Sequence, residues 1–232
     1  MMKPILFYGV PSGCSFGSIV ALEWLGRPYR LCRVEMPGEA GSDAYRRINP
    51  LAETPTLLTA GGETLSESMA ILNHIAAQGL EAQLGYPQGS PDFDRLNQML
   101  AFLNTTFFGA FAPLWHALEH EMRDAEKQVL LDYGREAVAK AHRQLEMMLA
   151  DRPWLLGAQR SVADAYFIGI ARWAEYLQVV DRSDYPNLQR LYNKLEQDPA
   201  VIFAHAIEQQ RPVVGGGGFA GEVPLAEALP AR

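Results

Sequence analysis

The spacing of apolar residues changes near residue 80, and this change constrains the possible folds more than any other feature of the sequence. Before it, short apolar runs alternate with helical stripes, whereas beyond it apolar residues recur at spacings of three and four in segment after segment. The intervening stretch is rich in turn residues: Gly79, Gly85, Pro87, Gly89 and Pro91. We therefore predict two domains and a glycine-rich tail, with bounds at 1–81, 91–210 and 211–232.

The first domain is predicted to mix strands and helices. Residues 5–8 form a short apolar run and residues 29–34 alternate, which indicates two strands flanking a helix at about 15–25. The glycine pair at 61–62 lies between two further apolar segments and suits a tight hairpin turn. A helix follows at about 68–77, so the predicted order is βαβ followed by ββα.

The second domain is predicted to be all-helical. Apolar stripes at helical spacing cover residues 96–114 and 138–148. Ser161 and Asp164 have the spacing of a capping box, which predicts a helix from there to about residue 176. Two shorter helices are predicted at about 186–197 and 199–209. The fold class is therefore α+β, with a mixed N-terminal domain and an all-α C-terminal helical bundle.

The tail carries four consecutive glycines, at 215–218. Such a run normally forms a flexible linker. If the tail docks on the rest of the chain, we expect Phe219, Val223 and Leu225 to be its anchors.

Charge and composition argue against two classes of partner. The 20 Lys and Arg residues face 27 Asp and Glu residues, so the net charge of -7 repels nucleic acid and anionic membranes. Residues 96–118 contain no charged side chain and are long enough to cross a bilayer. They nevertheless carry amides, hydroxyls and Pro113, which are costly in lipid. We predict a buried helix there, and neither a membrane nor a nucleic-acid partner.

Cysteine spacing predicts a cytoplasmic protein without a structural metal. Cys14 and Cys32 form no CxxC motif, which excludes a disulfide framework or a zinc ribbon and fits a reducing compartment. The apolar run at 5–8 is too short for a signal peptide. His116 and His120 have helical i, i+4 spacing but lack a third ligand at a fixed distance, so we expect no metal site.

Cys14 and Ser15 lie where the loop at 9–15 meets the first predicted helix. Unpaired amides and the helix dipole stabilise an anion at such a position and can lower the pKa of a thiol. This favours either an activated Cys14 or stabilisation of a bound thiolate. The alternative is that Cys14 is a packed small residue and Ser15 an ordinary N-cap.

Two further segments suit a peptide-like ligand. A cis bond before Pro55 at the start of a strand would leave the Thr54 backbone free to pair with an extended ligand. Glu67 and Ser68 open a helix, where free amides can bind a carboxylate and the Glu67 side chain can bind an ammonium. Each segment alone is also consistent with an ordinary strand-opening proline or with ordinary capping chemistry.

Taken together, these segments resemble the cytosolic glutathione transferases. The thiol loop at 9–15, the strand start at 54–55 and the helix start at 67–68 follow the order of that family's thioredoxin-like N-terminal domain. Residues 152–157 (RPWLLG) and 161–165 (SVADA) are similar to the family's WLxG and (S/T)xAD signature in its all-helical domain. The resemblance covers about 5–209 and implies a glutathione-binding site.

The resemblance is nearest the bacterial beta class, which has ACS where this chain has Gly13, Cys14 and Ser15. It implies that Cys14 and Ser15 are the catalytic residues, with Cys14 able to form a mixed disulfide and Ser15 able to donate to the thiolate. Ser12 is a secondary candidate, because serine-type classes have their hydroxyl slightly earlier. Tyr8 stands at the strand end used by tyrosine-type classes, but we interpret it as a core residue.

The resemblance also implies which residues hold glutathione. Glu67 and Ser68 would bind the γ-glutamyl amine and carboxylate, and Thr54, next to Pro55, would pair with the cysteinyl part. Glu53 joins this group where the family commonly has a neutral amide. It could repel a glutathione carboxylate or pair with a neighbouring arginine, Arg46 or Arg47.

The second substrate would meet an apolar pocket formed by Phe108, Phe111 and Trp115. Beta-class enzymes place a histidine and an asparagine near the glutathione sulfur, whereas our alignment puts Phe108 and Ala101 at those positions. We therefore expect a more apolar pocket than in that class.

The function implied is a glutathione transferase that activates the glutathione thiolate for conjugation to a small apolar electrophile, typically in detoxification. Glutathione would be a co-substrate, with no other cofactor. A homodimer is expected, which the exposed apolar residues of the helices near Met69 and Leu96 allow. Two alternatives stay open: a glutathione-dependent thiol-disulfide oxidoreductase using Cys14, and a non-catalytic module that binds ligands or proteins.

Overall fold

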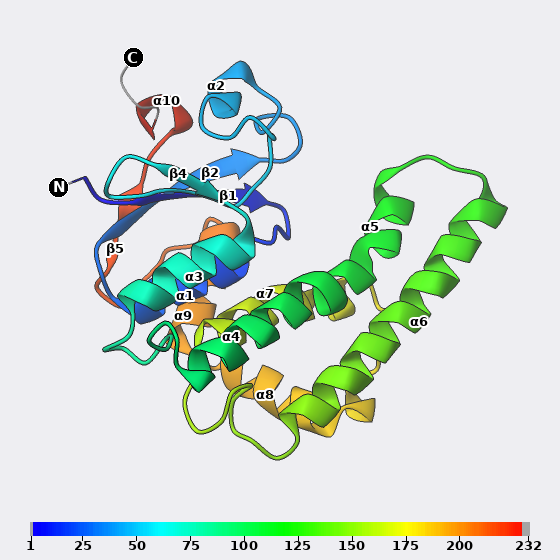
Figure 1. Ribbon diagram of the computed structural model, residues 1–232. Helices are drawn as coiled ribbons and strands as arrows, with labels where there is room; N and C mark the ends of the chain where they lie inside the picture. The colour runs from blue at the N-terminus through cyan, green and yellow to red at the C-terminus, as the bar shows by residue number, and fades with distance from the viewer. Residues whose placement is uncertain (1, 229–232) are drawn as a thin grey trace.

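The computed structural model describes residues 2–228 of the 232-residue chain. Its first part follows the predicted order of strands and helices (Figure 1). The elements are β1 (Ile5–Val10), α1 (Phe16–Leu25), β2 (Tyr29–Glu35), α2 (Asp43–Arg46), β3 (Thr56–Leu58), β4 (Thr64–Ser66) and α3 (Ser68–Gln78). The βαβ-ββα prediction is confirmed, and the short α2 is an addition that the sequence pattern did not indicate.

The sheet has the strand order β4-β3-β1-β2-β5, in which the tail supplies β5 (Phe219–Glu222). Strand β1 pairs in parallel with β2 and antiparallel with β3. Helices α1 and α3 cover one face of the sheet, while α2 and α10 (Leu225–Ala228) lie on the other (Figure 1). Because both faces are covered, every residue of β1 is buried, which explains its apolar character.

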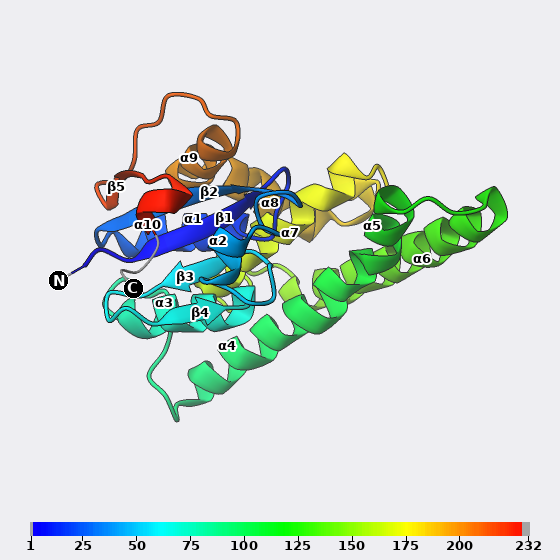
Figure 2. The ribbon, with the colours of Figure 1, turned by 90° about the horizontal axis from the view of Figure 1, so that it is seen from above.

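The second part is helical. Its elements are α4 (Pro91–Phe102), the π-helix η1 (Leu103–Phe108), the 3-10 turn η2 (Gly109–Phe111), α5 (Ala112–Glu119), α6 (Asp124–Leu149), α7 (Val162–Tyr176), the 3-10 turn η3 (Arg182–Asp184), α8 (Pro186–Glu196) and α9 (Pro199–Glu208). Helices α5 and α6 form a hairpin that extends away from the sheet (Figure 2). Within residues 2–228, no helix combines the length and the apolar character needed to cross a bilayer.

The predicted stripe at 96–114 is helical, but it is not a single α-helix. A π-helical turn changes the angle at which successive side chains project, and such turns are frequent at functional sites. Here Phe108 faces a cavity, whereas Phe107 and Phe111 are fully buried. Leu96 is also buried, with 1% of its surface exposed, because the stripe faces the core. Leu96 itself therefore offers no exposed surface to a second chain.

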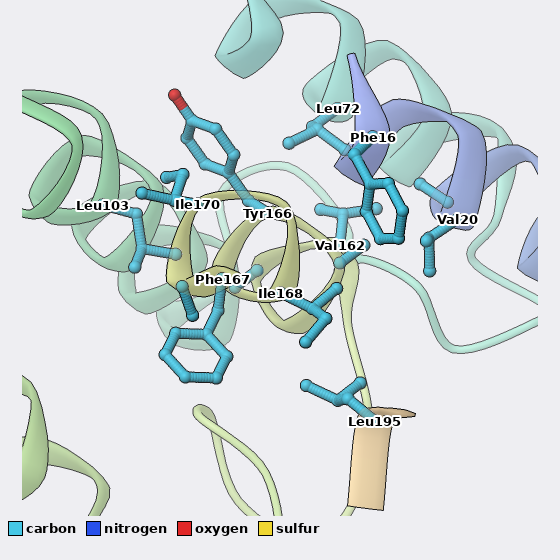
Figure 3. Packing of buried hydrophobic residues seen from close by; sticks show 14 of the residues in the cluster. Phe16, Val20, Leu72, Leu103, Val162, Tyr166, Phe167, Ile168, Ile170 and Leu195 are labelled. Atoms are coloured by element: carbon cyan, nitrogen blue, oxygen red, sulfur yellow. The ribbon is translucent and has the colours of Figure 1, made fainter. Parts of the chain in front are cut away.

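Helix α7 lies between the two domains, and the predicted capping box begins it. The Ser161 hydroxyl accepts from the Ala163 amide at 3.2 Å, and the Asp164 carboxylate accepts from the Ser161 amide at 2.8 Å. The same carboxylate accepts from the Leu155 amide at 2.9 Å. Figure 3 shows Phe16 of α1 beside the α7 turn that begins at Val162. The buried start of α7 thus has hydrogen-bond partners for its backbone amides, at the place where the two domains are in contact.

The tail docks on the sheet instead of remaining a free linker. Strand β5 runs parallel to β2, and Val223 and Leu225 are buried on the outer face. Phe219 packs against Tyr29 at a ring-centre distance of 6.0 Å. The Gly216 amide donates to a carboxylate oxygen of Glu23 at 2.6 Å. The expected anchors are confirmed, and the glycines let the backbone approach α1 closely.

Tyr8 is buried, as interpreted from the sequence, and its phenol is engaged by the tail. Its hydroxyl donates to Glu222 of β5 at 2.5 Å. The docked tail therefore holds the Tyr8 phenol within the fold, in agreement with its interpretation as a core residue.

Replacing Asp164 by Ala is expected to lower the free energy of unfolding by about 3 kcal/mol. The change leaves two buried amides, those of Leu155 and Ser161, without an acceptor. Urea unfolding followed by circular dichroism measures the effect. Asp181→Ala is the control, because the Asp181 carboxylate also accepts from a backbone amide, that of Ser183 at the start of a 3-10 turn, but is exposed. Equal losses in the two variants would contradict this role of the capping box.

His142 is expected to make the fold less stable as the pH falls from about 6.5 to about 4. Burial lowers the pKa of His142 to about 4, and Arg182 contributes. The unfolded chain therefore binds a proton in this range before the folded chain does, which favours unfolding by up to about 3 kcal/mol at the acid end. Urea unfolding at several pH values should show a flatter dependence for His142→Gln than for wild type. The exposed control, His116→Gln, should keep the wild-type slope, and three parallel curves would refute the assignment.

Candidate functional site

A cavity of about 480 Å³ lies where the loop after β1 meets the starts of β3 and α3 and the π-helix. Seven of the residues that we predicted for the site line it: Cys14, Glu53, Thr54, Pro55, Glu67, Ser68 and Phe108. Five others complete the lining: Met36, Asn49, Ser66, Asn104 and Tyr166. The fold thus brings most of the predicted site residues together from separate parts of the chain.

Cys14 presents its sulfur to this cavity. Its thiol donates to the Thr54 carbonyl, with Sγ 3.7 Å from the oxygen. Burial raises the pKa of the Cys14 thiol, and Glu53 and Glu67 add to the rise, while Arg172 and a backbone hydrogen bond oppose it. Desolvation therefore outweighs the helix start at Cys14, which is opposite to the lowered thiol pKa that the sequence suggested.

Ser15 does not reach the cavity. It is fully buried, and its hydroxyl oxygen accepts from the Gly9 amide of β1 at 3.0 Å. It also makes no side-chain cap of α1. Ser15 has helical backbone angles, φ -66° and ψ -20°, instead of the extended ones typical of a capping residue, and its side chain bonds to β1. The structure therefore gives no support to Ser15 as the donor to a bound thiolate.

Ser12, the secondary candidate, is also outside the cavity lining. Its carbonyl accepts from the Trp173 indole nitrogen at 2.9 Å, and its φ of 51° places it in the left-handed region. The next residue must be glycine, since a Cβ on Gly13 would lie 2.4 Å from the Gly9 carbonyl oxygen. The loop is thus held in a conformation that tolerates few residue types and that places Cys14, and not Ser12, at the cavity.

The strand start is organised as predicted. The peptide bond between Thr54 and Pro55 is cis. The Glu53 carbonyl accepts from the Tyr45 hydroxyl at 2.7 Å and from the Asn49 side-chain amide at 2.9 Å. These two side chains hold the backbone that presents Thr54 to the cavity.

Glu53 has no counter-ion in the described part of the chain. Arg46, which we considered as its partner, instead donates to the carbonyls of Gly41 and Pro50. No ion pair with Arg47 forms either within residues 2–228. The exposed carboxylate of Glu53 therefore adds negative charge to the rim of the cavity.

Glu67 and Ser68 begin α3 beside the cavity. Glu67 occupies the N-cap position with a φ of 70°, a sparsely populated conformation for a non-glycine residue that costs backbone strain. Its side chain is exposed and has no ion-pair partner among residues 2–228, whereas Ser68 is buried. The free carboxylate next to the first amides of α3 suits a ligand that carries both an ammonium and a carboxylate.

The aromatic residues predicted for a second substrate divide between cavity and core. Phe108 lines the cavity. Phe111 is fully buried against Trp173, at a ring-centre distance of 5.7 Å. Trp115 packs between Trp173 and Tyr176, outside the cavity lining. The predicted electrophile pocket is thus corrected to Phe108 alone, because the other two rings fill the space between α5 and α7.

Sequence reasoning missed several polar residues that line the cavity, among them Asn104 and Tyr166. The Tyr166 hydroxyl donates to the Asn104 side-chain oxygen at 2.6 Å. Burial raises the pKa of the Tyr166 phenol, so it stays a hydrogen-bond donor at neutral pH. Asn104 belongs to the π-helix, which the periodicity did not reveal, and its presence makes the cavity less apolar than expected. Tyr166 follows the SVADA segment directly, which is the signal that could have found it.

The His116 and His120 rings stack at a centre distance of 4.2 Å on the exposed side of α5. In the described part of the chain, no three His, Cys, Asp or Glu side chains group closely enough to hold a metal ion.

Comparisons with known proteins agree with this geometry. The family model of the glutathione S-transferase N-terminal domain matches residues 11–78, and that of the C-terminal domain matches residues 100–199. The glutathione S-transferase GST-4.5 of Xanthomonas campestris is 28% identical over 194 residues, which cover 84% of this chain and 94% of the relative. The glutathione S-transferase GstA of Escherichia coli O157:H7 is 28% identical over 205 residues, which cover 88% and 98%.

Two solved structures extend the comparison. A sphingomonad glutathione S-transferase complexed with glutathione is 32% identical, has a TM-score of 0.78, and the match covers 88% of this chain and 98% of that one. A beta-class enzyme of Sphingomonas chungbukensis is 30% identical with a TM-score of 0.77 and the same coverage. Both domains and nearly the full length of these relatives are matched, so this chain belongs to the glutathione S-transferase family, as a glutathione transferase with bacterial beta-class relatives.

Proposed function

We propose that this chain binds glutathione in the cavity beside Cys14 and conjugates its thiolate to a small apolar electrophile. The observation that carries the proposal is the convergence of three chain segments, each suited to one part of glutathione, on a single cavity. The γ-glutamyl ammonium and carboxylate meet Glu67 and the first amides of α3. The cysteinyl part pairs with the Thr54 backbone at the start of β3.

This placement puts the glutathione sulfur next to Cys14, because Cys14 Sγ lies 3.7 Å from the same Thr54 carbonyl. A free thiol with a pKa near 8.5 is only a few per cent ionised at neutral pH, so the site must favour the thiolate. The Cys14 thiol and the amides at the start of α1 are the donors nearest to it. Tyr166 and Asn104 add polar groups to the lining of the same cavity.

The second substrate enters beside Phe108 and Met36, which supply the apolar surface of the cavity. Its identity is proposed only as a small apolar electrophile, consistent with a role in detoxification. We further propose that the enzyme is a cytoplasmic homodimer that needs no cofactor besides glutathione as co-substrate. Met69 of α3, which is partly buried, stays a candidate for the dimer interface.

A thiol-disulfide exchange activity is a second candidate, because Cys14 and not Ser15 faces the cavity. The Cys14 thiolate attacks the glutathione sulfur of a mixed disulfide, the substrate thiolate leaves and takes a proton, and Cys14 becomes glutathionylated. A second glutathione thiolate attacks this disulfide, which releases glutathione disulfide and restores Cys14. The same cavity therefore supports both outcomes, and the comparisons favour the transferase.

Glu67→Gln is expected to weaken glutathione binding by about tenfold or more. The substitution keeps the shape of the side chain but removes the charge that pairs with the γ-glutamyl ammonium. Isothermal titration with glutathione and retention on immobilised glutathione measure the effect. Glu63→Gln is the matched control, since Glu63 is an exposed carboxylate outside the cavity lining. Unchanged affinity in both variants would overturn the site assignment.

Cys14→Ser is expected to separate the two activities. Disulfide reduction should be abolished, because a hydroxyl cannot form the mixed disulfide, while conjugation should stay within about tenfold of wild type. Conjugation of a chlorinated nitroaromatic and reduction of a glutathionylated thiol are measured on the same preparations. Loss of conjugation with retained glutathione binding would instead make Cys14 essential for thiolate activation.

A further inference from the structure

Arg172 of α7 is hydrogen-bonded to the thiol loop at residues 9–15. Its Nη2 donates to the Gly13 carbonyl at 2.8 Å, and its Nε donates to the Gly169 carbonyl at 3.1 Å. The guanidinium also lies over the Phe16 ring, 4.2 Å from its centre. With 12% of its side chain exposed, Arg172 is a nearly buried cation, and it contacts the residue that precedes Cys14.

Glu208 at the end of α9 binds this guanidinium in a fork. The two oxygens of Glu208 lie 2.6 Å from Nη1 and 2.9 Å from Nη2 of Arg172, and the Glu208 side chain is 11% exposed. The Glu208 carbonyl in turn accepts from Arg33 of β2 at 3.0 Å. Such a two-pronged pair holds a fixed geometry, so α7, α9 and β2 are fastened at one point.

The next residue of α7 contacts the preceding carbonyl of the loop. Trp173 donates from its indole nitrogen to the Ser12 carbonyl at 2.9 Å. The carbonyls of Ser12 and Gly13 are therefore both held by successive side chains of the helical domain. With both carbonyls turned toward α7, the following residue, Cys14, is left to face the cavity.

We propose that Arg172 is a positioning residue for Cys14. It holds the thiol loop through the Gly13 carbonyl and supplies a positive charge that stabilises a Cys14 thiolate, while its ion pair with Glu208 partly neutralises that charge. The inference rests on the proposed function in placing Cys14 at the glutathione site. The further point is that one ion pair of the helical domain, Arg172 with Glu208, determines how reactive the Cys14 thiol is.

The charges around Cys14 make opposite contributions that can be separated. Arg172 favours the thiolate, while Glu53 at the start of β3 and Glu67 at the start of α3 disfavour it. Tyr166 of α7 faces the same sulfur as a neutral phenol. Glu208 is paired with Arg172, and His205 packs against the Phe16 ring at a centre distance of 4.7 Å. Removing either member of the ion pair breaks the same contact but changes the charge near Cys14 in opposite directions.

The test compares Arg172→Gln with Glu208→Gln by the pH dependence of Cys14 alkylation with iodoacetamide, followed by mass spectrometry. Cys32 is fully buried and serves as an internal check that the chain stays folded. Arg172→Gln should move the midpoint to higher pH and slow alkylation at pH 7 by about three- to tenfold. Glu208→Gln should move the midpoint to lower pH and speed the reaction by a similar factor. Shifts in the same direction, or none, would show that the pair is merely structural.

Two further variants keep the test decisive if a single substitution disturbs folding. The double variant Arg172→Gln with Glu208→Gln leaves no unpaired buried charge and should react with a midpoint between those of the single variants. Arg172→Lys keeps the charge and should react faster than the double variant, and the opposite order would overturn the proposal. Alkylation needs no glutathione, so these results stand apart from glutathione retention, whose loss in wild type would refute the proposed function alone.

Discussion

The burial of α7 is the constraint on which the arrangement of both domains depends. Twelve of its 15 residues are buried, so the helix contacts neighbours on every side. Its approach to α1 requires glycine on both helices: a Cβ on Gly17 would lie 2.5 Å from the Ala165 carbonyl oxygen, and one on Gly169 would lie 2.8 Å from the Gly17 amide. A helix this buried cannot leave its first amides to water, and Ser161 and Asp164 satisfy them internally.

The site inherits its geometry from this contact. Because α7 is pressed against the start of α1, its side chains reach both the thiol loop and the cavity. Tyr166 faces the cavity, while Arg172 and Trp173 hold the loop carbonyls less than two turns further along. The reactivity of a thiol at a helix start is usually attributed to that helix alone. Here side chains of the opposing domain also determine how Cys14 is oriented. The two domains therefore form one functional unit rather than a binding domain with a separate pocket.

Local chemistry was predictable from the sequence, and long-range geometry was not. The order of strands and helices along the first domain, the capping box at Ser161 and the cis bond before Pro55 depend on nearby residues, and all three are confirmed. The orientation of Ser15 depends on a hydrogen bond to β1. The place of Asn104 in the cavity lining depends on a π-helix, which the spacing of apolar residues does not distinguish from an α-helix. Docking of the glycine-rich tail likewise depends on acceptors and apolar surface supplied by distant strands.

The charge distribution explains why the binding of glutathione must depend on short-range, directional contacts. Glu53 and Glu67 line the cavity, and none of the described residues lining it is a lysine or arginine. Glutathione brings two carboxylates, so the net charge of -7 gives it no long-range attraction. Arg172, the cation closest to the thiol loop, is already paired with Glu208. Affinity must therefore arise from directional contacts at the helix and strand starts, and thiolate stability from a cation whose charge is held in balance by its partner.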